Sequence, residues 1–166
     1  MKDSALQKTE VILSTTPTDT SGLPKRVADF ETLSDALDYA AQGQTGLNFY
    51  SSQGALETVH TYSDIQAEAQ ILARHMLGFG LERFSRVGIV ADMTVDFVTA
   101  FFAWQYAGLL AVPLPVVTGL GGRQGYEEQL NLVISNANCR LVLGPEKFLK
   151  SLENASHGLD VLLIGS

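Results

Sequence analysis

From residue 86 onward, apolar strand-like runs alternate with helical patterns, and this alternation leaves few architectures open. Four runs rich in Val, Leu and Ile are predicted to be strands, at 86–91, 109–114, 140–143 and 160–164. Helical patterns separate them, at 95–107, at 126–137 and around Phe148. Continuous apolar strands joined by helices specify a parallel sheet that is covered on both faces and connected by right-handed crossovers. The sequence therefore predicts an α/β fold, with a parallel sheet flanked by helices.

A helix and a hairpin are predicted before the sheet. Thr32 followed by Asp35 is a variant of the capping box, and apolar residues follow at helical spacing until Gly43. Residues 47–50 and 58–62 are short strand-like runs with a turn-rich segment between them. This arrangement is typical of a β-hairpin.

A second helix is predicted to begin at Ser63. The hydroxyl of Ser63 and the side chain of Gln66 have the spacing of a capping box, and Gly78 and Gly80 are expected to end the helix. Its apolar residues form one stripe, which must face a core. The stripe consists of Ile65, Ala69, Leu72, Ala73, Met76 and Leu77.

Composition and charge exclude several classes of protein. The chain has 166 residues and a net charge of −7, which argues against a basic nucleic-acid clamp. With 46% apolar and 17% charged residues it has enough apolar material for a packed globule. The single Cys139 cannot form an intramolecular disulfide, no secretory signal is recognised, and the apolar stretch 97–115 is too interrupted to span a membrane. We therefore expect a cytoplasmic protein.

The chain divides into two parts by composition. Residues 1–26 form a polar, turn-rich leader, in which residues 11–13 are the one apolar patch and a candidate edge strand. Residues 27–166 contain the predicted α/β elements. The last predicted strand is followed only by Gly165 and Ser166, although ligands of such sheets bind beyond the strand ends. We therefore expect residues 27–166 to be an incomplete subdomain of a longer enzyme.

A glycine-rich stretch at 118–125 follows one predicted strand and precedes a helix, as a dinucleotide-binding loop would. Glu146 lies 21 positions after Gly125, which adds to the likeness. The fingerprint requires glycine at three set positions, however, and Gln124 occupies the sixth position counted from Gly119. A surface connection is the favoured interpretation, and the chain contains no Gly-Lys pair for a Walker-type loop.

Metal and thiol chemistry find little support. His60, His75 and His157 are far apart and show no metal-ligand spacing, so no metal site is expected. Cys139 opens a buried strand and is expected to be structural.

Two sets of residues near the predicted strand 86–91 have both a structural and a functional interpretation. Asp92 and Thr94 follow this strand, at the edge where sites are usually built, but both are also good helix caps. Phe97, Phe101 and Trp104 repeat at helical spacing and are expected to be core. The alternative is that these three aromatic side chains line an apolar pocket.

Several segments together resemble the opening of the adenylate-forming superfamily, which comprises acyl-CoA synthetases, peptide-synthetase adenylation domains and luciferases. The segments are 60–65, 87–91 and 96–115. Within this superfamily, the chain most resembles fatty-acyl-AMP ligases, and the resemblance is carried by residues 46–50, 101–108 and 119–130. The resemblance covers about residues 29–164, and Phe84-Ser85 departs from the Gly-Asp that relatives usually carry.

This resemblance implies that the chain is the N-terminal portion of the large domain of an enzyme that uses ATP and Mg²⁺. A fatty acid becomes an acyl adenylate and then passes to a carrier protein or a polyketide or peptide synthetase. The resemblance places the phosphate-binding loop and the catalytic residues outside this chain, so we expect the chain alone to be inactive. Phe97, Phe101 and Trp104 are the candidate substrate-binding residues.

Three alternatives remain. The enzyme could be an acyl-CoA synthetase of the same superfamily, the chain could be a stand-alone nucleotide-binding domain, or it could be an interaction module without catalysis. Thermal protection of the isolated chain by a nucleotide would favour the second alternative, and a defined partner without a ligand response would favour the third.

Overall fold

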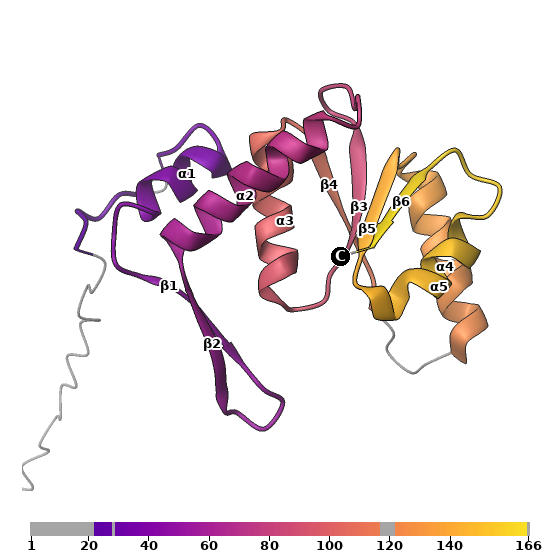
Figure 1. Ribbon diagram of the computed structural model, residues 1–166, viewed down its shortest axis with the longest axis horizontal. Coiled ribbons are helices and arrows are strands. Elements are labelled where there is room, and N and C mark those ends of the chain that lie inside the picture. Colours follow the sequence, from indigo (N-terminus) through magenta and orange to yellow (C-terminus); the bar gives the residue numbers. More distant parts are fainter. Residues whose placement is uncertain (1–21, 28, 117–121, 166) are drawn as a thin grey trace, which may run out of the picture.

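The computed structural model describes residues 22–27, 29–116 and 122–165 of the chain. The candidate strand at 11–13 and most of the polar leader lie outside these ranges. Eleven elements follow one another along the described chain, and Figure 1 shows their arrangement. They are α1 (Leu33–Ala40), β1 (Gly46–Tyr50), β2 (Leu56–Thr61), α2 (Tyr62–Leu77), β3 (Arg86–Val90), α3 (Val95–Tyr106), β4 (Leu110–Leu114), α4 (Gly122–Asn136), β5 (Leu141–Gly144), α5 (Glu146–Ser156) and β6 (Leu162–Gly165).

The four predicted strands form one parallel sheet, in the order β4-β3-β5-β6. β3 lies between β4 and β5 and pairs in parallel with both. Pro113 pairs with Ile89 from β4, where a residue without an N–H is tolerated because β4 is an edge strand. The predicted α/β fold with a parallel sheet is confirmed.

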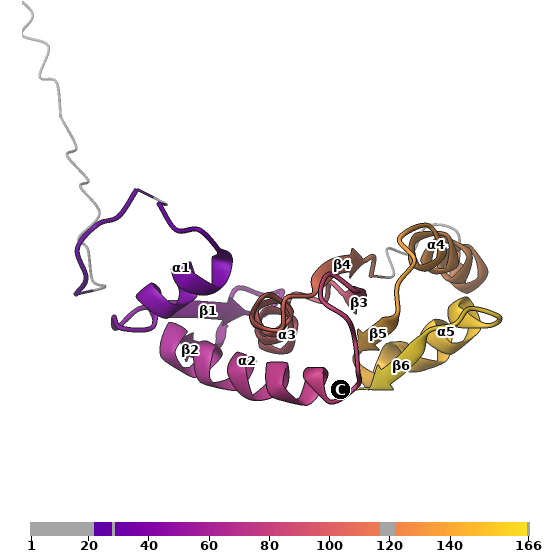
Figure 2. The same cartoon turned by 90° about the horizontal axis from the view of Figure 1, so that it is seen from above.

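Helices cover both faces of the sheet, and Figure 2 shows α2 and α3 on one side and α4 and α5 on the other. The strands supply alternate residues to two separate cores, because successive side chains of a strand point to opposite faces. Val87 and Ile89 of β3 pack with α2 and α3, whereas Val90 packs with α4 and α5. The strands are therefore apolar on both faces, as their continuous apolar sequence predicts.

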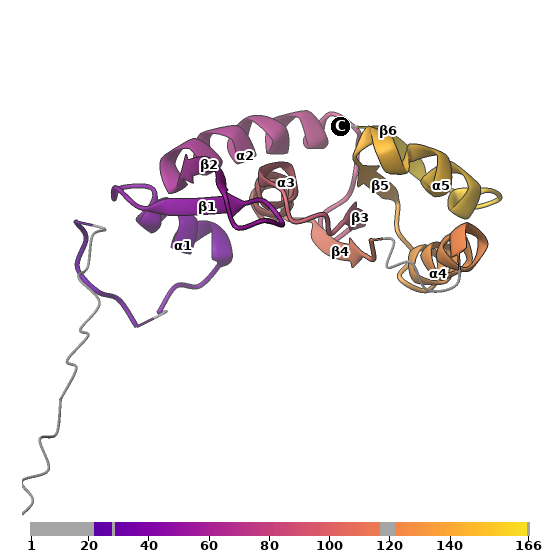
Figure 3. The same cartoon turned by 90° about the horizontal axis from the view of Figure 1, so that it is seen from below.

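The elements before the sheet form a smaller layer beside α2, as Figure 3 shows. Thr32 and Asp35 make the predicted capping box at the start of α1. β1 and β2 pair antiparallel, so the predicted hairpin is confirmed. Two predictions for α2 are wrong: its capping box joins Thr61 and Asp64 rather than the predicted pair two residues later, and Leu77 of the predicted stripe is 58% exposed.

Three helices are held together by one carboxylate. Asp38 Oδ1 on α1 accepts hydrogen bonds from Tyr106 Oη on α3 and from Gln66 Nε2 on α2, the latter at 2.7 Å. All three side chains are half-buried. This network fixes α1 beside the layer formed by α2 and α3.

Candidate functional site at the carboxyl edge of the sheet

β3 and β5 are neighbouring strands that send the chain to opposite faces of the sheet. β3 leads into α3, which packs with α2, and β5 leads into α5, which packs with α4. Ligands of open parallel sheets bind beyond the carboxyl ends of the strands, at the point where the strand order reverses in this way. The carboxyl edge of β3 and β5 is therefore the candidate functional site.

A small pocket of about 20 Å³ lies at this edge. Its walls come from the ends of β3 and β5 and from the first turn of α3, and they include Thr94, Asp96, Phe97, Gly144 and Pro145. The volume is enough for about one water molecule.

An ion pair joins the two segments that follow these strands. Lys147 Nζ lies 2.5 Å from Asp92 Oδ2, and the side chains are 62% and 24% exposed, respectively. The Asp92 Oδ2 atom itself is buried. Lys147 Nζ also lies 5.1 Å from the centroid of the Phe148 ring. The ion pair thus connects the start of α5 with the loop between β3 and α3, across the candidate site.

Only one of the two expected helix caps is a cap. Thr94 Oγ1 accepts a hydrogen bond from the backbone N–H of Phe97 at 3.3 Å and begins α3. The Asp92 side chain pairs with Lys147 instead. Sequence reasoning missed Lys147, although it stands three residues after β5 and two residues after Pro145, where a side chain is carried to the carboxyl edge.

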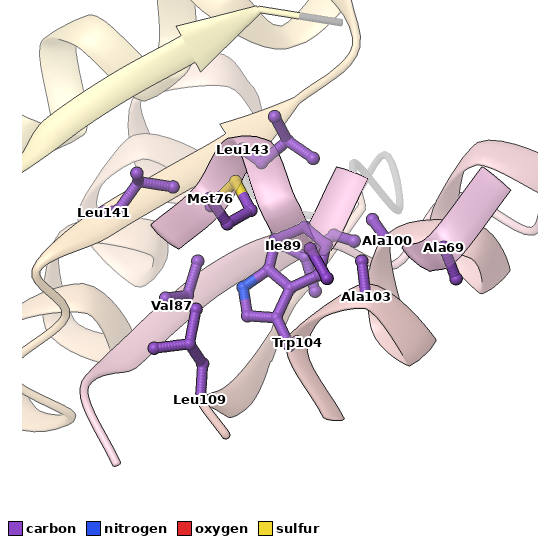
Figure 4. Packing of buried hydrophobic residues seen from close by; sticks show 11 residues of the cluster. Ala69, Met76, Val87, Ile89, Ala100, Ala103, Trp104, Leu109, Leu141 and Leu143 are labelled. Carbon is purple, nitrogen blue, oxygen red and sulfur yellow. The ribbon is translucent and has the colours of Figure 1, made fainter. Parts of the chain in front are cut away.

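The three aromatic residues of α3 do not share one environment. Phe97 and Phe101 are half-buried, with their ring centroids 6.5 Å apart, and Phe97 lines the small pocket. Trp104 is fully buried, and Figure 4 shows it in the core beside Met76 and Val87. Residues at i, i+4 and i+7 lie on one face of a helix, so the difference follows position along α3: Phe97 lies in the first turn, at the carboxyl edge, and Trp104 lies in the last turn, over the sheet.

The glycine-rich stretch is only partly a loop. Residues 122–125 form the start of α4, which begins four residues earlier than the sequence pattern predicts, and residues 118–121 lie outside the described ranges. A Cβ on Gly125 would meet nothing within 4 Å, so this glycine is not required for a close approach. Glu146 is the exposed first residue of α5.

The histidines of the described chain are dispersed. The side chains of His60, His75 and His157 lie in different elements or loops, and His60 packs edge-on against Phe49. No group of three His, Cys, Asp or Glu residues in the described chain is placed to hold a metal ion. No helix among the described residues is long and apolar enough to cross a membrane.

The chain matches known proteins in sequence and in fold. The AMP-binding enzyme family matches residues 37–164, which is most of the chain. The chain belongs to this family. A curated relative from Caulobacter vibrioides (strain NA1000 / CB15N), which carries the name "Putative acyl-CoA synthetase", is 41% identical over 138 residues.

Solved structures agree with this assignment. A structure from a study of fatty acyl-adenylate ligases of E. coli and L. pneumophila superposes with a TM-score of 0.82 at 36% identity, over 86% of this chain. An adenylation domain of a keto acid-selecting NRPS module superposes with a TM-score of 0.69 at 18% identity, which shows the shared fold. The chain spans about a quarter of the length of the proteins it matches, 24% of the Caulobacter relative and 26% of the fatty acyl-adenylate ligase structure.

Proposed function

We propose that this chain forms part of an ATP-dependent ligase that activates a fatty acid as an acyl adenylate and passes the acyl group to a carrier protein. One observation carries the proposal: the match at 36% identity and a TM-score of 0.82 to a structure from a study of fatty acyl-adenylate ligases. The match extends over 86% of the chain, so it rests on the whole α/β layer rather than on one motif.

The acyl chain is proposed to lie against Phe97 and Phe101. Both side chains are half-buried, Phe97 lines the pocket at the carboxyl edge where ligands of parallel sheets bind, and the Phe101 ring lies 6.5 Å from that of Phe97. An apolar wall suits a hydrocarbon chain. Trp104 is proposed to act on this wall through the packing of α3, because its ring lies in the core.

ATP and Mg²⁺ are proposed to bind elsewhere in the full enzyme. The described residues do not fit such a site: residues 122–125 are helical, Asp92 is paired with Lys147, and the carboxyl-edge pocket measures about 20 Å³. The sequence also contains no Gly-Lys pair. We therefore expect no ATP–pyrophosphate exchange from the 166-residue chain alone, and robust exchange would contradict this expectation.

A different acceptor of the acyl group, coenzyme A, also has support. The Caulobacter relative at 41% identity is named as an acyl-CoA synthetase, which favours coenzyme A in place of a carrier protein. A cytoplasmic location and the division of the chain at residue 26 also remain predictions.

A chimeric enzyme tests the activation step. This chain would replace the matching quarter of the fatty acyl-adenylate ligase of known structure, and fatty-acid-dependent ATP–pyrophosphate exchange would be measured over a series of acyl lengths. We expect activity, and we expect Phe97→Ala and Phe101→Ala to shift the preferred length. Tyr50→Ala, on the exposed hairpin, is the control variant.

Two outcomes would count against the proposal. A cooperative thermal melt would show that the chimera folds. A folded chimera that activates only aromatic carboxylic acids or amino acids would refute the fatty-acid assignment. An unchanged length profile in both phenylalanine variants would remove these residues from the acyl site. Transfer of the acyl group to coenzyme A rather than to a carrier protein would decide for the second acceptor.

A further inference from the structure

A hollow on the described surface lies at the opposite, amino edge of the sheet. It has a volume of about 550 Å³, within the range of small-molecule sites, and it is formed by the segment before β3 and by the residues that enter β5 and β6. It therefore lies away from the carboxyl edge and the proposed acyl site.

Three arginines line this hollow in a chain whose net charge is −7. Arg86 and Arg140 stand directly before Val87 and Leu141, which pair in register on neighbouring parallel strands. The backbone N–H of Arg140 donates to the carbonyl oxygen of Arg86 at 2.8 Å. Strands in a sheet are about 5 Å apart, so two like charges leave adjacent strands at nearly the same level.

Two acidic residues, Glu82 and Asp160, line the hollow with the three arginines and leave part of the positive charge unpaired. Arg140 Nη1 pairs with Asp160 Oδ2 at 3.0 Å, on a side chain that is 92% exposed. Among the described residues, no ion pair within 4 Å involves Arg83 or Arg86. Burial raises the pKa of the Cys139 thiol, two residues before β5, and the charge of Arg86 acts against that rise.

Aromatic rings border the same hollow. Phe79 is 47% exposed and Phe84 is 57% exposed, and the Arg83 guanidinium carbon lies 4.7 Å from the centroid of the Phe84 ring. Phe84 also has a φ of 67°, a left-handed conformation that costs a non-glycine residue energy.

We propose that this hollow binds a phosphate monoester that carries a flat apolar group. The phosphate oxygens lie between Arg86 and Arg140, since guanidinium groups donate forked hydrogen bonds to an oxyanion. The flat group packs on Phe84. The volume supports this assignment, because 550 Å³ is far more than a phosphate alone requires.

Phenyl phosphate is the test ligand, titrated by calorimetry into the 166-residue chain, with inorganic phosphate and benzyl alcohol as partial ligands. We expect phenyl phosphate to bind with a Kd in the millimolar range or tighter, inorganic phosphate to bind more weakly, and benzyl alcohol not to bind. Arg86→Gln should weaken the binding of phenyl phosphate about tenfold or more, and Arg86→Lys should retain part of it.

Arg123→Gln is the matched control, because it removes the same charge from the start of α4, which follows β4 at the other edge of the sheet. Arg123→Gln should leave the Kd for phenyl phosphate within about twofold of the value for the unmodified chain, well under the tenfold change expected for Arg86→Gln. A thermal melt without ligand separates binding from folding, since Arg86 makes no ion pair among the described residues and Arg86→Gln should melt close to the unmodified chain. Absence of phenyl phosphate binding, or equal binding by the unmodified chain and Arg86→Gln, would overturn the proposal.

Discussion

Replacing Tyr106 with phenylalanine removes the hydroxyl that joins α3 to Asp38 on α1. The hydroxyl donates to a charged carboxylate, and Gln66 Nε2, at 2.7 Å, would be the remaining donor of the network to Asp38 Oδ1. Hydrogen bonds to charged groups stabilise by more than neutral ones. We therefore expect Tyr106→Phe to lower the free energy of unfolding by about 1–2 kcal/mol near neutral pH.

The same network predicts a dependence on alkaline pH. The pKa of Tyr106 is raised from 10.0 to about 12, first by burial and then by the hydrogen bond to Asp38 and its charge. The fold thus favours the neutral phenol, so this contribution is complete below pH 10 and is lost as the pH rises to about 12. The shift corresponds to about 3 kcal/mol at most. We take about half of that, because the side chain is only half-buried and solvent screens the Asp38 charge.

Urea denaturation followed by circular dichroism, at a series of pH values from neutral to above 10, measures both effects. The stability gap between the unmodified chain and Tyr106→Phe should be widest near neutral pH and should narrow as the pH passes 10. Tyr50→Phe is the control, since Tyr50 is 58% exposed on the hairpin and should leave stability unchanged. A gap that is absent near neutral pH, or that stays constant above pH 10, would refute the reasoning.

Three further predictions concern packing and the candidate site. Gly144→Ala should lower the free energy of unfolding by about 1–3 kcal/mol, because the new Cβ would lie 2.6 Å from a leucine methyl of α5. Gly125 has no neighbour within 4 Å of such a Cβ, so Gly125→Ala should raise the free energy of unfolding by about 0.5–1 kcal/mol. Equal effects of the two substitutions in urea denaturation would contradict the packing argument. Trp104→Phe should cost less than about 2 kcal/mol, since the buried indole N–H has no hydrogen-bond partner among the described residues, and a thermal melt that shows a larger loss would argue for an unrecognised partner. Lys147→Gln should cost about 1 kcal/mol or more in urea denaturation, because it leaves a buried oxygen of Asp92 without its cation, and an unchanged midpoint would show that solvent already satisfies that oxygen.

Local sequence patterns predicted the start of α1 correctly and the start of α2 wrongly, for a reason that lies outside the helix. Two capping patterns overlap there, Thr61 with Asp64 and Ser63 with Gln66. The hairpin decides between them, because β2 ends at Thr61 and the Tyr62 N–H donates to the Thr45 carbonyl oxygen at 3.0 Å. The backbone therefore leaves the strand at Thr61, which takes the cap position.

The predicted start of α4 is wrong for a related reason. Glycines are permissive rather than directive, so residues 122–125 fit either a loop or a helix. In the structure α4 begins at Gly122, and within it Tyr126 and Leu130 are buried against the sheet. Burial of these side chains supplies energy that the intrinsic preference of the glycines does not.

Periodicity along the chain was enough to assign strands, helices, a two-faced sheet and the apolar residues that fill its cores, since each depends on the spacing of neighbouring side chains. It carried no information about which strand lies beside β3. After β4 the chain crosses back over the sheet, and β5 pairs with β3. This pairing brings Asp92 and Lys147 together at the carboxyl edge and Arg86 and Arg140 together at the amino edge. These pairs are 54 or 55 residues apart in sequence, and they meet because α3 and α4 pack on opposite faces and carry successive strands in opposite directions along the sheet.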